Sequence, residues 1–423
     1  MTDNSQKSSH RFIDKVRSLG NPRILVTMLL AFSSGLPLSL TGSTLQAWYT
    51  VSGVSIMAIG ALSLVGQPYV YKFLWSPLLD RYNPPFLGRR RGWVAIFQFV
   101  LVLSLAIMAF MNPKTTPWLL AFMALLTAFF SATQDIAIDA YRTDLLHANE
   151  RGFGAAVTAF GYRIALIFSG GLALVMADLM GWRATYLIMA GLLALEMLVV
   201  RFSPEPEQRT SAPTSLVKAL VEPFKEFLTR PAAIAILLFV LLYKLSDVIA
   251  LSLSTPFLLR GIGFSLSDVG VLYKTVGLIA TLFGAFVGGA WLGSMGLFRS
   301  LMVFGILQGL SNLMFAILAI VGKSYPLLIG TIFIEGFCGG LSNVAIIAFL
   351  MGLCNVRYTA TQYALLSALS AIPRVFIGPF AAWLVEDVGW INFFLISVVA
   401  MVPSLILLWW MKRKIDFNAT HLG

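Results

Sequence analysis

The sequence predicts an all-α membrane protein with twelve transmembrane helices arranged as two related halves of six. Of its 423 residues, 58% are hydrophobic and 12% are charged, and the mean hydropathy is +0.84. A soluble domain carries roughly 25% charged residues, so most of this chain has too few to face water. The apolar residues form long segments, and the longest polar interruption, 203–230, separates six segments from six.

Each predicted span reaches the roughly 20 residues that a helix needs to cross the hydrocarbon core. The spans are 24–45, 56–79, 93–112, 117–141, 152–177, 182–202, 231–259, 266–292, 298–320, 325–352, 360–384 and 391–411. They define five regions: a cytoplasmic N-terminal tail 1–23, an N-terminal half 24–202, a cytoplasmic central loop 203–230, a C-terminal half 231–411 and a cytoplasmic C-terminal tail 412–423.

The distribution of Lys and Arg predicts the orientation. With the N-terminus inside, the inner segments carry 21 of these cations and the outer loops carry four, which are Lys114, Arg183, Arg260 and Lys323. Cytoplasmic loops of membrane proteins carry such an excess. Both termini are therefore expected in the cytoplasm. The same distribution explains the formal charge of +11 without a nucleic-acid partner.

Three matches between the halves indicate a duplication. Gly53, Ser55 and Gly60 match Gly263, Ser265 and Gly270 at an offset of 210. Arg163 matches Arg374 at 211, and the pair Gly181-Trp182 matches Gly389-Trp390 at 208. Related halves with binding between them are a transporter architecture, so we expect solute transport.

Other classes of function find little support. The two cysteines exclude a disulfide framework, and the three histidines lie outside every span, so we expect no metal site and no cofactor. No phosphate-cradling Walker motif is present, and no histidine-centred catalytic triad can form inside the membrane, so we expect no enzyme. The polar start of the chain predicts no cleavable signal peptide. A channel or a membrane sensor stays open as an alternative.

Several motifs resemble a known family. The loop Asp80-Arg81-Tyr82-Asn83-Pro84-Pro85-Phe86-Leu87-Gly88-Arg89-Arg90-Arg91 is similar to the loop between helices two and three of the major facilitator superfamily, although it is longer and has Ser76-Pro77 where a glycine is usual. Further runs resemble its AmpG branch, the bacterial muropeptide permeases. They are Ser34-Gly35-Leu36-Pro37-Leu38, Leu45-Gln46-Ala47-Trp48, Lys72-Phe73-Leu74-Trp75-Ser76-Pro77, Ser131-Ala132-Thr133-Gln134-Asp135-Ile136, Tyr243-Lys244-Leu245-Ser246-Asp247 and Ala364-Leu365-Leu366-Ser367-Ala368-Leu369-Ser370.

The resemblance implies the major facilitator superfamily fold in the bacterial inner membrane, and we expect a monomer. It also implies proton-coupled import, by alternating access, of anhydromuropeptides, which are GlcNAc-anhydroMurNAc with or without a stem peptide, for cell-wall recycling. The energy source would be the proton gradient. AmpG-like proteins often have further hydrophobic segments at the C-terminus, and we expect the core transporter not to need them. Transport of acetyl-CoA or another solute by the same superfamily is the alternative.

Ionic side chains inside the predicted spans mark the candidate site, because a charge near the bilayer centre costs roughly 2.5–3.5 kcal/mol on insertion scales. We single out Lys72, Asp135, Asp139, Arg163, Lys244, Asp247, Lys274, Glu335 and Arg374. The carboxylates fall on spans four, seven and ten, and all cations except Lys244 fall on spans two, five, eight and eleven. By resemblance, these spans line or flank one internal space where opposite charges meet.

The carboxylates Asp135, Asp139, Asp247 and Glu335 are candidates for proton coupling. Asp135 and Asp139 share a helix face, where two like charges repel unless one is paired or protonated. The structural alternatives are an ion pair for Asp135 and a bond from Asp139 to Arg142. Lys244 is three residues from Asp247 and can neutralise it.

Glu335 has no ionic neighbour in sequence and can take up a proton if burial favours its neutral form. Its structural alternative is an ion pair with Lys274 or Arg374. Gln134 either binds sugar hydroxyls and amides or links two helices. Gly35 interrupts span one and can expose backbone to a cavity, or it serves packing.

The substrate-binding candidates are Gly35, Gln134, Arg163, Lys244, Lys274 and Arg374. Arg163 and Arg374 present planar guanidinium groups suited to carboxylates, and stem peptides end in carboxylates; tying neighbouring helices together is the alternative. We assign Lys72, Asp80, Arg81, Arg89 and Arg90 to a cytoplasmic gate, since an acid there can engage basic loops or helix N-termini in one state only.

Overall fold

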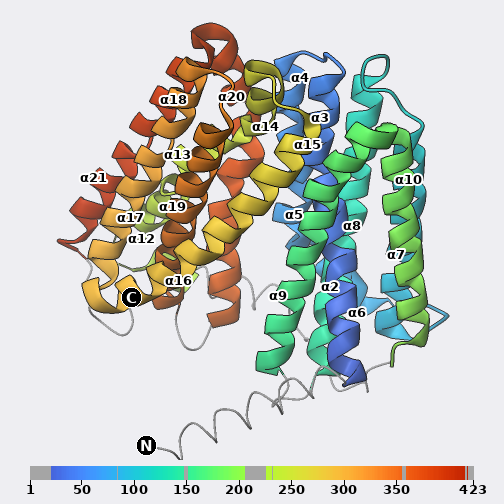
Figure 1. Ribbon diagram of the computed structural model, residues 1–423. Coiled ribbons are helices and arrows are strands. Elements are labelled where there is room, and N and C mark those ends of the chain that lie inside the picture. The colour runs from blue at the N-terminus through green and yellow to red at the C-terminus, as the bar shows by residue number, and fades with distance from the viewer. Residues whose placement is uncertain are drawn as a thin grey trace, which may run out of the picture. The chain divides into compact units, whose positions relative to one another are not determined.

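The computed structural model describes residues 21–423 except 83, 147–150, 205–224, 231, 355–358, 415–416 and 418–423. Within these residues all regular structure is helical, as Figure 1 shows. The elements before the central loop are α2 (Pro22–Thr41), α3 (Ser43–Val51), α4 (Ile56–Ala61), η1 (Leu62–Gly66), α5 (Gln67–Tyr71), η2 (Lys72–Leu74), α6 (Ser76–Arg81), α7 (Arg89–Ala109), α8 (Pro117–Leu145), α9 (Arg151–Ile167), η3 (Phe168–Leu172) and α10 (Ala173–Phe202).

The elements after the central loop continue the helical pattern. They are α12 (Ala233–Leu242), α13 (Leu245–Ser252), α14 (Ser254–Pro256), η4 (Phe257–Ile262), α15 (Leu266–Asp268), η5 (Val269–Val276), α16 (Gly277–Met295), α17 (Leu297–Ser311), α18 (Leu313–Val321), α19 (Tyr325–Gly352), α20 (Thr359–Val399) and α21 (Val402–Met411). Here η1 and η2 are 3-10 turns, and η3, η4 and η5 are π-helical.

Helix starts follow local sequence signals. The side chain of Asn21 accepts a hydrogen bond from the backbone N–H of Arg23 at 3.1 Å, and Pro22 opens α2. Asparagine caps helix N-termini well, and proline is tolerated in the first turn because its missing N–H would have no helical partner there. α8 and α19 also begin with a proline in the first turn.

Among the described residues, nine helical stretches are long and apolar enough to cross a membrane. Two of them, Val157–Phe202 and Leu365–Met411, contain 46 and 47 residues. Each is interrupted by a glycine with positive φ, Gly181 at 82° and Gly389 at 76°. The chain between Ile56 and Arg81, where the sequence predicts span two, is helical only in short pieces. The first span is longer than predicted and breaks at Gly42.

The glycines matched between the two halves have matching backbone conformations. Gly53 and Gly263 have φ of 77° and 87°, and Gly181 and Gly389 both have positive φ. Positive φ is a conformation that glycine adopts without a steric penalty. Ser55 and Ser265 each accept a hydrogen bond from the backbone N–H three residues later. These matched glycines and serines thus have the same local role in both halves.

The chain folds as two compact units. The first comprises Met1–Leu45 and Val65–Ala212, and the second comprises Gln46–Leu64 and Pro213–Gly423. The second unit therefore includes a segment that the sequence assigns to the N-terminal half.

Each unit has its own apolar core. The core of the first unit includes Leu30, Val94 and Tyr141, and that of the second includes Phe239, Phe304 and Phe349.

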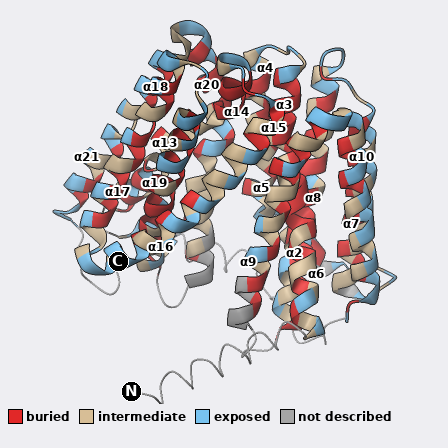
Figure 2. Cartoon of the chain, in the orientation of Figure 1, coloured by how far each residue is buried: buried red, intermediate tan, exposed pale blue. Residues whose placement is uncertain are grey.

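Many large apolar residues remain exposed along the helices. Figure 2 marks exposed positions of every residue type in pale blue. Phe202, Phe286 and Leu179 are 81%, 79% and 77% exposed. Soluble monomers rarely expose large contiguous apolar patches, so these helices meet lipid rather than water.

Candidate functional site

In the first unit, Asp135 is the centre of a buried polar cluster. It lies on α8 and is 9% exposed. The hydroxyl of Ser34 on α2 donates a hydrogen bond to Asp135 Oδ1, and Lys72 Nζ lies 3.7 Å from Asp135 Oδ2. The sequence left two roles open for Asp135, proton coupling and an ion pair, and the structure contains the ion pair. Lys72, predicted as a gate residue, is the cation of this pair.

The irregular course of the second predicted span places Lys72. The residue opens the 3-10 turn η2 and follows α5, which starts at Gln67-Pro68. Next in the chain, Trp75 Nε1 donates to Thr133 Oγ1 at 3.0 Å, and the Trp75 ring lies 4.9 Å from that of Phe129. These contacts bind the end of the turn to the helix that carries Asp135.

Gln134 links helices in this structure. Its Nε2 donates to Ser33 Oγ at 3.0 Å, and Gln98 Nε2 on α7 donates to the same oxygen at 3.1 Å. Both glutamines are 0% exposed, and neither amide oxygen has a hydrogen-bond partner among the described residues. Gln134 thus lies in the contact between α2, α7 and α8 rather than on an accessible wall. Sequence inspection did not single out Gln98.

Gly35 allows α2 and α9 to approach closely. A Cβ at Gly35 would lie 2.9 Å from Ala165 Cβ and 3.0 Å from the carbonyl oxygen of Tyr162. Gly35 is buried, so in this structure it serves helix packing, which is one of the two roles that the sequence predicts for it. Arg163, two residues before Ala165 on α9, is exposed and forms no ion pair within 4.0 Å with a described residue.

Asp139 lies apart from the buried cluster. Its side chain is 57% exposed, and Asp139 Oδ1 is 3.1 Å from Arg142 Nη2. The sequence left two roles open for Asp139, and this ion pair with Arg142 is the structural one. An exposed pair of this kind contributes at most about 1 kcal/mol to stability.

In the second unit, Lys244 and Asp247 form the centre of the corresponding cluster. Lys244 Nζ lies 3.7 Å from Asp247 Oδ2, and the side chains are 12% and 14% exposed. Gln308 on α17 donates from Nε2 to Asp247 Oδ1 at 2.8 Å. On the same helix, Asn312 donates to the carbonyl and hydroxyl oxygens of Ser246, both at 3.1 Å. The sequence predicts the ion pair but not the two amides that hold α13.

Glu335 on α19 faces this cluster without a cation of its own. It is 8% exposed and has no basic group within 4.0 Å among the described residues, so it does not pair with Lys274 or Arg374. A Cβ added at Gly339 would lie 3.4 Å from Gln308 Oε1 and 3.8 Å from Glu335 Oε1. Glu335 therefore lies close to the cluster around Asp247. Glu335 and Arg374 both act electrostatically on Lys244.

Lys274 and Arg374 differ in their surroundings. Lys274 lies on the π-helical segment η5, and its Nζ is 5.1 Å from the centre of the Tyr273 ring. The Tyr273 hydroxyl is 2.8 Å from Ser254 Oγ. Arg374 on α20 is exposed and near Lys244.

At the predicted cytoplasmic end of the first unit, Arg90 Nε lies 2.7 Å from Asp144 Oδ2, which ties the start of α7 to the end of α8. Arg91 donates to the carbonyl oxygen of Ser203. The side chains of Asp80, Arg81 and Arg89 lie outside the described part of the structure, so the gate role of these three stays a prediction.

A second arginine cluster lies in the other unit and was not noticed in the sequence. Arg230 pairs with Glu226 Oε2 at 2.9 Å, donates to the carbonyl oxygen of Leu353, and lies 3.4 Å from Gln362 Oε1. Its side chain is 7% exposed. Burial raises the pKa of the neighbouring Cys354 thiol, and the Arg230 charge acts in the opposite direction.

Glu196 on α10 is a further carboxylate inside a predicted span. Its Oε2 is buried without a hydrogen-bond partner among the described residues. The same rule that selected the other intramembrane ions applies to it, and sequence inspection overlooked it.

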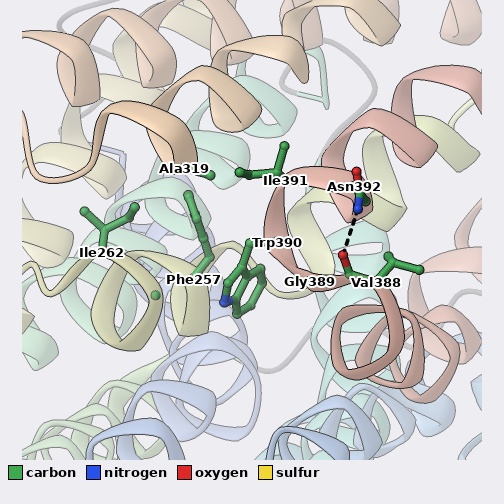
Figure 3. A pocket seen from close by; sticks show the side chains of 9 residues that line it. Phe257, Ile262, Ala319, Val388, Gly389, Trp390, Ile391 and Asn392 are labelled. Atoms are coloured by element: carbon green, nitrogen blue, oxygen red, sulfur yellow. Dashed lines mark hydrogen bonds between the residues drawn. The ribbon is translucent and has the colours of Figure 1, made fainter.

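A recess of about 310 Å³ lies at the predicted outer end of the second unit. Phe257, Gly261, Trp390 and Asn392 are among its lining residues, and Figure 3 shows the Asn392 amide bonded to the carbonyl oxygen of Val388 at 3.0 Å. No lining residue is charged and none is a predicted site residue. The two charged clusters, rather than this recess, are the candidate site.

Comparisons with known proteins identify the family of the chain. A family model described as Major Facilitator Superfamily matches residues 23–377. The anhydromuropeptide permease of Escherichia coli (strain K12) is 48% identical over 407 residues, covering 96% of this chain and 83% of that protein. A protein of Rickettsia felis described as putative transporter AmpG 4 is 33% identical over 404 residues, covering 93% and 97%.

Solved structures share the fold. The nucleoside transporter NupG matches with a TM-score of 0.70 at 16% identity, over 92% of this chain and 99% of that one. A POT family transporter in complex with a thioalcohol-conjugated peptide matches with a TM-score of 0.72 at 13% identity, over 94% and 96%. The chain is thus a multi-pass membrane transporter that belongs to the Major Facilitator Superfamily and, within it, to the family of the anhydromuropeptide permease of E. coli.

Proposed function

We propose that this chain imports anhydromuropeptides across the bacterial inner membrane by proton-coupled alternating access. The relative that is 48% identical over 96% of the chain bears the name anhydromuropeptide permease, and this similarity supports the substrate class. The intramembrane carboxylates support coupling to protons, because such residues in transporters serve as proton relays. We further propose that the protein works as a monomer.

Twelve membrane crossings in two halves, 24–202 and 231–411, form part of this proposal. A helix of 46 residues would be about 69 Å long, more than twice the roughly 30 Å of the hydrocarbon core, so the stretches broken at Gly181 and Gly389 each provide two crossings. The short helical pieces between Ile56 and Arg81 provide one more. The excess of inner cations supports cytoplasmic termini.

Glu335 is the proposed proton carrier. The observation that carries this assignment is a buried carboxylate with no basic group within 4.0 Å among the described residues, next to a cluster in which Asp247 is paired with Lys244. A carboxylate in such a place gains a proton more readily than one beside a cation. Asp135 and Asp247, each with a lysine at 3.7 Å, have less reason to take up the proton at rest.

The substrate is proposed to contact the cations that remain accessible. Arg163 and Arg374 are exposed and have no ion pair within 4.0 Å to a described residue, so their guanidinium groups can bind carboxylates of a stem peptide. Lys244 can exchange Asp247 for a substrate carboxylate. Lys274 extends the same positive lining from η5.

The test is uptake of labelled GlcNAc-anhydroMurNAc into proteoliposomes, with and without an inward proton gradient. Glu335→Gln is expected to abolish the accumulation driven by the gradient while keeping exchange of labelled for unlabelled substrate. Glu386→Gln, at an exposed glutamate of α20, is the matched control and should leave accumulation unchanged. Gradient-driven accumulation by Glu335→Gln would refute the carrier assignment. Absence of any uptake, with acetyl-CoA transported instead, would refute the substrate.

A further inference from the structure

Four exposed cations lie in the second unit, where α17 begins and α21 ends. They are Arg299 in the first turn of α17 and Lys412, Arg413 and Lys414 directly after α21, and these two helices pack against each other. None of the four has a carboxylate oxygen within 4.0 Å among the described residues. α16, α17 and α21 contain no Asp or Glu, and Asp416 lies outside the described part of the chain. We call these four residues the basic patch.

Aromatic rings hold two members of the basic patch in place. Lys412 Nζ lies 4.9 Å from the centre of the Phe298 ring on α17. The guanidinium carbon of Arg413 lies 4.5 Å from the centre of the Trp409 ring on α21. Phe417 is 8% exposed and packs against Phe298 with ring centres 5.4 Å apart, so the chain beyond the patch returns to the apolar core. Cation–π contacts orient the cations but leave their charge available to an anion.

Helix stability does not explain the basic patch as a whole. The backbone N–H groups of Lys412, Arg413 and Lys414 donate to carbonyl oxygens three or four residues earlier, at 3.1, 3.2 and 2.9 Å. These bonds already serve carbonyls at the end of α21, where a cation is favoured. Arg299 is the third residue of α17, and the positive end of a helix disfavours a cation there. Arg299 therefore needs another reason for its position.

Other cations at the predicted inner ends of the helices are neutralised within the protein. Three ion pairs show this: Arg90 with Asp144 at 2.7 Å, Arg142 with Asp139 at 3.1 Å, and Arg230 with Glu226 at 2.9 Å. Membrane orientation requires inner cations, but it does not require four of them to be grouped without an acid. Because like charges repel, such a group is stabilised by an anion from outside the protein.

The surroundings of the basic patch indicate a lipid as the source of this anion. Trp409 and Trp410 are 54% and 43% exposed beside the cations, and tryptophan is enriched where the membrane meets water. The patch therefore lies at the level of the lipid headgroups. Basic clusters directly cytoplasmic of a membrane helix attract anionic lipids, and arginine and lysine both bind phosphate.

We propose that the basic patch binds the headgroup of an anionic phospholipid in the inner leaflet, with the acyl chains against the exposed apolar side chains of α21. This binding site goes beyond the proposed function. Only the choice of leaflet rests on it, through the proposed cytoplasmic position of the C-terminus. The binding of the headgroup depends neither on the transported solute nor on proton coupling.

The test is native mass spectrometry of the purified full chain in detergent, titrated with phosphatidylglycerol or with phosphatidylcholine of the same acyl chains. The Kd of the first bound lipid is expected to be about tenfold lower for phosphatidylglycerol. The triple variant Lys412→Gln, Arg413→Gln, Lys414→Gln should reduce this difference to about twofold or less. Arg299→Gln alone should raise the Kd for phosphatidylglycerol about threefold and leave that for phosphatidylcholine unchanged.

A charge-matched control is the triple variant Lys114→Gln, Arg183→Gln, Lys323→Gln, which removes three predicted outer cations. It should keep the full preference for phosphatidylglycerol. Equal binding of the two lipids by the unaltered protein, or an equal loss of preference in both triple variants, would overturn the proposal. Displacement of phosphatidylglycerol by inorganic phosphate at the concentration of the lipid would assign the patch to a free anion and overturn the lipid assignment. If the patch triple variant does not fold, the single variant Arg299→Gln decides. The measurement needs no substrate and no proton gradient, so its failure is distinguishable from a failure of the proposed function.

Discussion

Replacing Lys72 by glutamine leaves the Asp135 carboxylate buried without its cation. The pair is separated by 3.7 Å, with side-chain exposures of 33% and 12%. At this separation, two unit charges attract by about 4.5 kcal/mol at an effective dielectric constant of 20 and by about 1.1 kcal/mol in water. Because Lys72 is one-third exposed, solvent screens part of this attraction. We therefore expect Lys72→Gln to lower the free energy of unfolding by about 1–3 kcal/mol.

A double-mutant cycle isolates this interaction. Asp135→Asn removes the buried charge, so adding Lys72→Gln to it should cost little, and the coupling energy should be about 1–3 kcal/mol. The assay is SDS-induced unfolding of purified protein in mild detergent. The exposed pair of Asp139 and Arg142 is the matched control, with an expected coupling below about 0.5 kcal/mol. Additive effects of Lys72→Gln and Asp135→Asn would refute the reasoning that the lysine compensates the buried carboxylate.

Three further predictions concern stability by the same assay. Gly35→Val should lower the free energy of unfolding by about 1–3 kcal/mol, because a larger side chain would collide with Ala165. At Gly191 nothing lies within 4 Å, so Gly191→Val should change the free energy of unfolding by no more than about 0.5 kcal/mol. Equal effects of the two variants would contradict the packing role of Gly35. Arg230→Ala should cost about 2 kcal/mol through the lost bonds to Glu226 and Leu353, while the exposed Arg201→Ala should be near neutral. Gln308→Leu should cost about 1–2 kcal/mol, since Asp247 loses a hydrogen bond; no change would show that this bond contributes little.

The repeat was visible in the sequence at two of the places where the backbone has a positive φ that favours glycine. Gly53 and Gly263 kept their identity because both have positive φ, and the offset between them was enough to find the match. Gly88 and Gly296 form another such pair, with φ of 81° and 77°, each directly before a helix. This pair was missed because its surroundings diverged: three arginines follow Gly88, whereas a leucine and a phenylalanine follow Gly296.

The ionic residues were also visible, but their partners depended on three-dimensional details. The pair of Lys244 with Asp247 was predictable because it is local. The pair of Lys72 with Asp135 was not, since the 3-10 turn at Lys72 has no periodic signature in an apolar segment. Buried amides such as Gln308 give no sequence signal for which helix they will link. Their roles appear only when the helices are packed.

Gly181 is the only non-helical residue between Ala173 and Phe202, and Gly389 has the same place in α20. In the proposed topology, each joins two membrane crossings without an intervening loop. The ribosome therefore delivers the two helices to the translocon as one continuous hairpin, whose turn carries few charged residues across, namely Asp178 and Arg183 at the first and Glu386 and Asp387 at the second. Both helices satisfy their own backbone hydrogen bonds, so the hairpin can enter the lipid as a unit. These two turns are consequently poor places for epitope insertion, because an added peptide would separate the helices that must enter together.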